Sequence, residues 1–345
     1  MAVTRSAAVP EIDRFAVSFD HRDRGRLHAL WDQVLDAERW SEGDMVGAFE
    51  SAWSAWNGLP AVACSSWTGA ALAALEYAGV QGEPVLCPSN TFMAAPLVIQ
   101  QAGGRVVFVD CNREDLCASL SEIVAKAQAH RPRAVFLTHI GGHLAFDVEE
   151  IAAFCEAEGI FLIEDCAHAH GASWNGRRAG TWGDAGVWSF APTKTMSTGE
   201  GGMLVSRHDD VVEFARAFRN YGKPDYRVHG LNFRMSEFTA AVGLVGVERL
   251  DEIVEWKNAA ARELLDPKYS ARLRLPDGMI SGLYKYIVFQ PLDRSTGTVY
   301  GTPCHRALGF QDRLVNTEWV AANHWCAPLY YRPRADDEAR RLVAP

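Results

Sequence analysis

The sequence predicts an α/β protein with a mainly parallel central sheet that is flanked by helices on both faces. Between residues 61 and 206, short apolar segments alternate with longer segments of helical periodicity. The apolar segments are continuous, as expected of strands that are buried on both faces. A length of 345 residues favours one large domain plus a smaller one.

Composition excludes several classes of function. The net charge is -9, the pI is near 5.7, and no basic stripe indicates nucleic-acid binding. No apolar run approaches membrane-spanning length, and the first residues do not resemble a secretory signal. The eight cysteines lie in apolar surroundings without a Cys-x-x-Cys pair, which is typical of reduced thiols. We therefore expect a cytoplasmic protein that binds neither nucleic acid nor a membrane.

The expected elements follow in order. After an arm at residues 1–45, which contains a short helix at 24–38, a helix is expected at 44–56 and a strand from residue 61. Further strands are expected at 84–87, 105–110, 134–140, 160–165, 185–190 and 202–206. Further helices are expected at 93–101, 116–130, 147–158 and 235–250. Asp147 and Glu150 predict a capping box for the helix at 147–158.

One lysine lies in an unusual loop between the last two strands. Lys194 is surrounded by small polar residues, and three glycines cluster around Glu200. Glycine is used where the backbone turns tightly or approaches another group closely. A lysine at the mouth of a sheet can be partly desolvated, which lowers its pKa and frees the amine to attack an aldehyde. A solvated loop lysine is the alternative that the loop alone leaves open.

Two other segments place polar groups at expected strand ends. Thr68 opens an alanine-rich helix, where free amides and the helix dipole form an anion site; a plain N-cap by Thr68 is the alternative. Asp165 ends an apolar strand, where it either caps a loop or meets a cation such as the nitrogen of a pyridoxal cofactor. Ligands bind outside the carboxyl ends of such strands. One site is therefore expected from Thr68, Phe92, Asp165 and the loop of Lys194.

A metal site is not predicted. His168 and His170 follow Asp165 closely, but neither a third ligand nor a helical His-x-x-x-His pair accompanies them.

Three motifs in this order resemble those of the DegT/DnrJ/EryC1/StrS aminotransferases, which are pyridoxal 5'-phosphate (PLP) enzymes of fold type I. They lie at residues 164–172, 189–202 and 230–235, and the resemblance extends from about Trp40 to about Leu250. Residues 283–286 and 326–330 still resemble elements of the family's small domain. The resemblance implies a large PLP-binding domain at 1–250 and a smaller α+β domain at 251–345.

The resemblance also implies catalytic roles. Lys194 would attach PLP and then move protons, and Asp165 would pair with the pyridinium nitrogen. Phe92 would stack on the cofactor ring, with core packing as its alternative. His168 would lie against the other face of the ring, at a position where the family usually has glutamine.

The phosphate of PLP would be held by two segments of one chain and one of its neighbour. Thr68, the Gly69 backbone and Ser189 would supply one side, with Trp67 in the same turn. The resemblance places Asn232 at the phosphate of the neighbouring subunit, and nothing in the sequence places it beside its own Thr68 and Ser189. An asparagine that only satisfies a turn is the alternative. We therefore expect a homodimer with shared active sites.

The resemblance predicts a transaminase that moves an amino group from glutamate or glutamine to a ketone on a nucleotide-linked sugar. A cyclitol ketone of the inosose type is an alternative acceptor, and a non-catalytic PLP-binding sensor is an alternative class. Lys194 argues against a dehydratase, since those relatives carry histidine there. Three departures bear on the substrate: Trp67 replaces a glycine, His168 replaces glutamine, and the chain after Lys257 is short.

Overall fold

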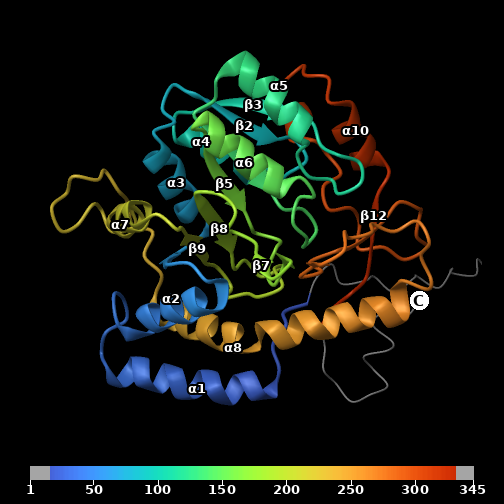
Figure 1. Ribbon diagram of the computed structural model, residues 1–345. Helices are drawn as coiled ribbons and strands as arrows, with labels where there is room; N and C mark the ends of the chain where they lie inside the picture. The colour runs from blue at the N-terminus through green and yellow to red at the C-terminus, as the bar shows by residue number, and fades with distance from the viewer. Residues whose placement is uncertain (1–15, 332–345) are drawn as a thin grey trace, which may run out of the picture.

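The protein is built around a seven-stranded sheet (Figure 1). Its structure is a computed structural model that describes residues 16–331. The strand order is β1-β9-β8-β5-β4-β2-β3. The strands are β1 (Ala61–Cys64), β2 (Pro84–Pro88), β3 (Arg105–Val109), β4 (Ala134–Thr138), β5 (Phe161–Asp165), β8 (Ala185–Ser189) and β9 (Gly202–Val205). Within this sheet only the pairings of β1 with β9 and β9 with β8 are antiparallel, which confirms the mainly parallel arrangement.

Helices cover both faces of the sheet and create two hydrophobic cores. Alternate residues of β1 enter different cores, Ala61 and Ala63 one and Val62 and Cys64 the other, so each strand is apolar throughout. The helices are α1 (His21–Asp36), α2 (Asp44–Asn57), α3 (Trp67–Ala78), α4 (Ala94–Gln101), α5 (Leu120–His130), α6 (Val148–Glu158), α7 (Asp209–Phe218) and α8 (Glu237–Ala260). In Figure 1, α8 lies along α1 and α2 below the sheet. Within residues 16–331, no helix combines the length and hydropathy that a bilayer crossing requires.

Several predicted boundaries are wrong for identifiable reasons. Helix α1 begins at His21 because Asp20 and Asp23 form a capping box there. Helix α5 begins at Leu120 and not at 116, since Leu116 adopts a positive φ of 65°. Asp147 caps no amide of α6; its Oδ2 instead accepts a hydrogen bond from the Leu120 amide at 3.1 Å. The predicted capping box is therefore replaced by a link between α5 and α6. The part of the predicted arm at residues 1–15 lies outside the described residues.

The C-terminal region returns to the large sheet. Asp110, which follows β3, accepts hydrogen bonds from the Asn316 and Thr317 amides and so caps α10 (Val315–Ala322). The remaining short elements are β6 (Ser173–Trp174), β7 (Arg177–Arg178), η1 (Ala261–Leu265), β10 (Met279–Ile280), β11 (Tyr286–Val288), α9 (Cys304–Ala307) and β12 (Trp325–Ala327). Helix α8 runs through residue 250, and the division into two domains at that residue stays a prediction.

The eight cysteines are all buried and unpaired, as the sequence predicts. Burial raises the pKa of their thiols, for example that of Cys64 to about 12. They behave as small core residues and carry no thiolate chemistry near neutral pH.

Candidate active site

Lys194 and Asp165 meet at the carboxyl edge of the sheet. Asp165 ends β5, and the loop that carries Lys194 follows the neighbouring parallel strand β8. Burial lowers the pKa of Lys194 to about 8, opposed by the negative charge of Asp165. Burial raises the pKa of Asp165, opposed by the Ala167 amide and by the charge of Lys194. The charge of each group therefore affects the pKa of the other, as expected from their positions at the ends of two neighbouring strands.

Asp165 has a partner that the sequence did not indicate. The indole Nε1 of Trp67 donates a hydrogen bond of 2.9 Å to Asp165 Oδ1, and the Ala167 amide donates one of 3.1 Å to the same oxygen. Trp67 is buried at the first position of α3. Its indole thus orients the Asp165 carboxylate, and both of these donors use Oδ1.

The segments that are expected to hold the phosphate meet at the start of α3. The N-cap is Ser66, whose hydroxyl accepts from the Gly69 amide at 3.3 Å, so the alternative of a Thr68 N-cap is wrong. Thr68 is exposed at the next position after Trp67. Ser189 ends β8 directly opposite Gly202 of β9. A Cβ on Gly202 would lie 2.3 Å from the Ser66 carbonyl oxygen, so only glycine allows β9 to pass beneath this turn.

Four rings form near-parallel pairs close to Lys194, which lies 5.0 Å from the centre of one of them, Tyr284. The ring centroids are 6.5 Å apart for Phe92 and Tyr300, 5.7 Å for Tyr300 and His168, and 4.0 Å for His168 and Tyr284. The interplanar angles are 28°, 20° and 20°. Tyr300 is thus the near-parallel neighbour of both Phe92 and His168, the two side chains expected on either face of the cofactor. Phe92 itself is 62% exposed, so core packing does not explain it.

His168 is a neutral imidazole near pH 7. Burial, together with the charges of Lys194 and Lys285, holds its pKa well below the usual range. Its Nε2 lies 3.2 Å from the Tyr300 hydroxyl, whereas its buried Nδ1 has no hydrogen-bond partner in the described part of the chain. That orphaned nitrogen is a polar atom available to a ligand.

The donor set fits PLP. An amine with a lowered pKa, a buried carboxylate and a helix N-terminus lie at the same edge of the sheet. Because Gly202 has no side chain, the start of α3 lies close to Gly202 and therefore to Ser189, which is opposite Gly202. The Tyr300 ring lies against both Phe92 and His168, so we expect it to move when a cofactor stacks between those two side chains. No sequence pattern pointed to Tyr300, because only the return of residues 289–322 to the large sheet brings it to this edge.

Tyr300→Ala is expected to accelerate cofactor uptake by the apo-protein about fivefold to tenfold, since the ring no longer has to leave its stacking neighbours. Stopped-flow absorbance after mixing with PLP measures the association rate. The exposed Tyr226 provides a matched control as Tyr226→Ala. Uptake that is slower in Tyr300→Ala than in wild type would show that the tyrosine assists binding instead.

The segment of Asn232 lies closer to its own phosphate turn than expected. The Ser65 amide donates a hydrogen bond of 2.7 Å to the Phe233 carbonyl, and a Cβ on Gly69 would meet the Phe233 ring at 2.7 Å. The expectation that nothing places this segment beside its own Thr68 is therefore wrong. Asn232 itself is exposed, and its Oδ1 accepts from the Arg234 amide at 3.3 Å. Which subunit its side chain serves stays a prediction.

Two further lysines that the sequence did not single out lie near Lys194. Lys194 Nζ is 5.0 Å and Lys285 Nζ is 5.3 Å from the centre of the Tyr284 ring. Lys257 is buried on α8, where its Nζ donates to the Leu283 carbonyl at 3.2 Å, and burial lowers its pKa to about 7. Positive charge is thus concentrated on the Tyr284 side of the site.

One buried cluster has the composition of a metal site. His139, Glu164 and Cys166 lie together, and His139 Nε2 is 2.8 Å from a Glu164 oxygen. Both oxygens of this carboxylate already accept hydrogen bonds, from the amides of Gly180, Trp182 and Gly183. The cluster is therefore a satisfied structural network, and neither His168 nor His170 belongs to it.

Known proteins share this architecture. A sequence profile of the DegT/DnrJ/EryC1/StrS aminotransferase family matches residues 22–272. The chain is 32% identical to a dTDP-3-amino-3,4,6-trideoxy-alpha-D-glucose transaminase of Micromonospora megalomicea subsp. nigra, over 84% of this chain and 85% of that protein. It is 34% identical to a pleiotropic regulatory protein of Geobacillus stearothermophilus, over 90% and 91%.

A solved structure agrees with these sequence matches. The crystal structure of S. venezuelae DesV in complex with a ketimine intermediate superposes with a TM-score of 0.87, at 25% identity and with 97% of each chain covered. This likeness confirms the predicted fold class. The chain therefore belongs to the DegT/DnrJ/EryC1/StrS aminotransferase family, whose members are PLP-dependent transaminases.

Proposed function

We propose that this aminotransferase transfers an amino group from glutamate or glutamine to a ketone on a nucleotide-linked sugar. The observation that carries the chemistry is the Lys194 amine, with a pKa of about 8, beside the buried Asp165 carboxylate. When bound, PLP supplies an aldehyde for amine exchange and an electron sink. The chain's own groups bind, orient and move protons around it.

Each residue has a role that follows from its surroundings. Lys194 Nζ accepts the proton from the α-carbon of the donor and returns a proton later, which a lowered pKa permits near neutral pH. Asp165 keeps a proton on the ring nitrogen, and Trp67 holds the carboxylate in place for this. Neutral His168 would pack against the ring, and its Nδ1, which has no hydrogen-bond partner within residues 16–331, would be available to a polar ligand atom. Ser189 and the first amides of α3 hold the phosphate.

The acceptor class is supported by the names of relatives, which include the dTDP-sugar transaminase. One relative is named a pleiotropic regulatory protein, so a non-catalytic PLP-binding sensor is the alternative to be tested. Incubation of the PLP-loaded protein with L-glutamate should release one equivalent of 2-oxoglutarate per site and abolish the absorbance of the aldehyde form. No release from either glutamate or glutamine would contradict the transaminase assignment. A screen of nucleotide-linked keto-sugars and keto-cyclitols then identifies the acceptor.

The protein is also proposed to be a homodimer whose Asn232 completes the partner's phosphate site, and to work in the cytoplasm. A two-fold interface would apply this contact at both sites symmetrically. The alternative is that Asn232 serves its own chain, beside Phe233 and Gly69.

Mixing Lys194→Ala subunits with Asn232→Ala subunits is expected to restore activity. In a shared arrangement, one site of each hybrid dimer contains both intact groups, whereas the parent dimers contain none. Activity after mixing and re-association measures the effect, and mixing either variant with itself is the control. A mixture that stays inactive would show that Asn232 acts within its own chain.

A further inference from the structure

Lys257 is a buried cation that lines the same small cavity as Lys194. It lies on α8 and is only 5% exposed, and its Nζ donates a hydrogen bond of 3.2 Å to the Leu283 carbonyl. No carboxylate within residues 16–331 forms an ion pair with it. A buried ammonium group without a counter-charge destabilises a fold, so packing alone does not explain a lysine at this position.

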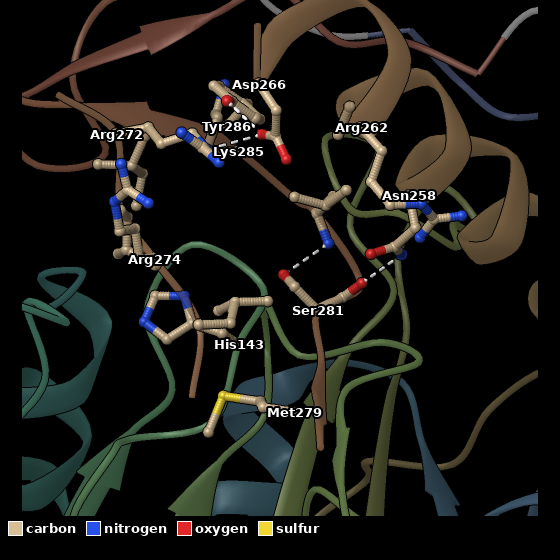
Figure 2. A pocket seen from close by; sticks show the side chains of 15 residues that line it. His143, Asn258, Arg262, Asp266, Arg272, Arg274, Met279, Ser281, Lys285 and Tyr286 are labelled. Atoms are coloured by element: carbon tan, nitrogen blue, oxygen red, sulfur yellow. Dashed lines mark hydrogen bonds and ion pairs between the residues drawn. The ribbon is translucent and has the colours of Figure 1, made fainter. Parts of the chain in front are cut away.

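The carbonyl that Lys257 binds belongs to a turn with unfavourable backbone geometry. Leu283 has a φ of 45°, in the left-handed region that residues other than glycine rarely adopt. Such a conformation persists where surrounding contacts impose it. Helix α8 supplies a second contact, because Asn258 Nδ2 donates to the Ser281 carbonyl at 2.8 Å, and the Ser281 hydroxyl accepts from the Leu283 amide at 3.0 Å. Figure 2 shows these two hydrogen bonds beside a cavity between the end of α8 and residues 272–287.

The same turn is held by the loop that follows β4. The Gly142 carbonyl accepts a hydrogen bond from the Gly282 amide at 2.7 Å. The Gly141 carbonyl accepts one from the Lys285 amide at 2.8 Å. A Cβ on Gly142 would lie 2.5 Å from the Tyr284 amide nitrogen, so the two backbones are in direct contact. The turn is therefore fixed by both α8 and this loop, and the backbone of Tyr284 is fixed with it.

The Tyr284 ring is the part of this turn that reaches the candidate active site. It stacks on His168 with 4.0 Å between the ring centroids, and Lys194 Nζ lies 5.0 Å from its centre. Its hydroxyl is 3.4 Å from Thr193 Oγ1, at the residue before Lys194. An aromatic ring at this distance attracts an ammonium group and also excludes water from it. The position of Tyr284 therefore determines the surroundings of the Lys194 amine.

We propose that Lys257 is a positioning residue that holds the Tyr284 ring in place beside Lys194. It acts through the Leu283 carbonyl and so influences the reacting amine indirectly. This inference goes beyond the proposed function, which assigns a role to Lys194 but none to α8. The burial of the Lys194 amine then depends in part on a side chain of that helix.

The test measures the pKa of Lys194 in the full-length protein without PLP, by trace acetylation with acetic anhydride at a series of pH values and peptide mapping. Lys257→Met removes the donor at similar volume, so Tyr284 should move and water should reach Lys194. Burial is the largest cause of the lowered Lys194 pKa, so its partial loss outweighs the lost attraction of the ring for a cation. The pKa should rise by about one unit, which slows acetylation at pH 7 about tenfold.

A double-mutant cycle with Tyr284→Ala shows whether the effect passes through the ring. Tyr284→Ala should raise the Lys194 pKa at least as much, and adding Lys257→Met should then raise it no further. Lys268→Met makes the same substitution at an exposed lysine over the Tyr269 ring and is the matched control. Thermal unfolding monitors the fold of each variant. Lys257→Gln, whose side chain is too short to reach the carbonyl, repeats the test if Lys257→Met does not fold.

The outcomes separate this proposal from the transaminase assignment. An unchanged Lys194 pKa in Lys257→Met would overturn the proposal. Additive shifts in the double variant would also overturn it, since Lys257 would then act independently of Tyr284. Acetylation requires no turnover, so failure of the glutamate half-reaction in wild type would overturn the proposed function and leave the acetylation result standing.

Discussion

Lys194→Ala is expected to abolish transamination while leaving the fold intact. No other described lysine combines a position beside Asp165 with a pKa lowered to about 8. The loss in turnover should exceed about a thousandfold, because both the attachment of the cofactor and the proton transfer depend on this amine. Steady-state amination and release of 2-oxoglutarate measure it. Lys223→Ala, in the loop after α7, is the control and should remain active.

The pH dependence of attachment gives a sharper test of the same residue. The deprotonated amine is the reactive form, so attachment should accelerate about tenfold per pH unit below pH 8 and level off above it. Reduction with borohydride followed by peptide mapping should place the label on Lys194. A label on Lys223 or Lys285 would end the assignment, and a rate that falls as pH rises would contradict the lowered pKa.

Asp165→Asn is expected to slow the glutamate half-reaction by about a hundredfold or more, since the neutral amide cannot keep a proton on the ring nitrogen. The shape of the site should survive, because the amide oxygen of the new side chain can still accept from Trp67 Nε1 in place of Asp165 Oδ1. Single-turnover absorbance measures the rate, and PLP binding is measured separately by titration.

Trp67→Phe provides the comparison for Asp165→Asn. It removes the N–H that holds Oδ1 but keeps the negative charge, so it should slow the half-reaction far less than Asp165→Asn does. A near-normal half-reaction in Asp165→Asn would show that the carboxylate is not required for the electron sink.

The sequence predicted those parts of the molecule that depend on local pattern. Strands buried on both faces appear as continuous apolar runs, and Asp165 and Lys194 follow two of them, so their meeting at one edge could be anticipated. The glycines around Glu200 also follow a local rule, since Gly202 has no room for a side chain. Helix boundaries that depend on N-caps were less predictable. Ser66 and Asp20 are the N-caps in the structure, but neighbouring polar side chains could equally have capped the same helices.

The remaining features depend on contacts between distant segments. Trp67 reaches Asp165 across 98 positions of sequence, and Tyr300 reaches His168 across 132. Neither pairing has a periodic or compositional signal. The cavity between the end of α8 and residues 272–287 is similar, because its arginines come from the end of one helix and from a later irregular segment. Such side chains become neighbours only after the C-terminal region has folded back onto the sheet.

The close passage of β9 beneath the start of α3 limits how this enzyme can be altered. Even alanine at Gly202 would push the Ser66 carbonyl and the Trp67 amide outward, and the amides at the helix start would move with them. If these amides hold the phosphate as proposed, that side of the phosphate site is fixed by backbone packing and offers no position for tuning cofactor retention. The adjustable side is the one where Thr68 is exposed. Engineering of cofactor affinity in this protein should begin there and leave Gly202 untouched.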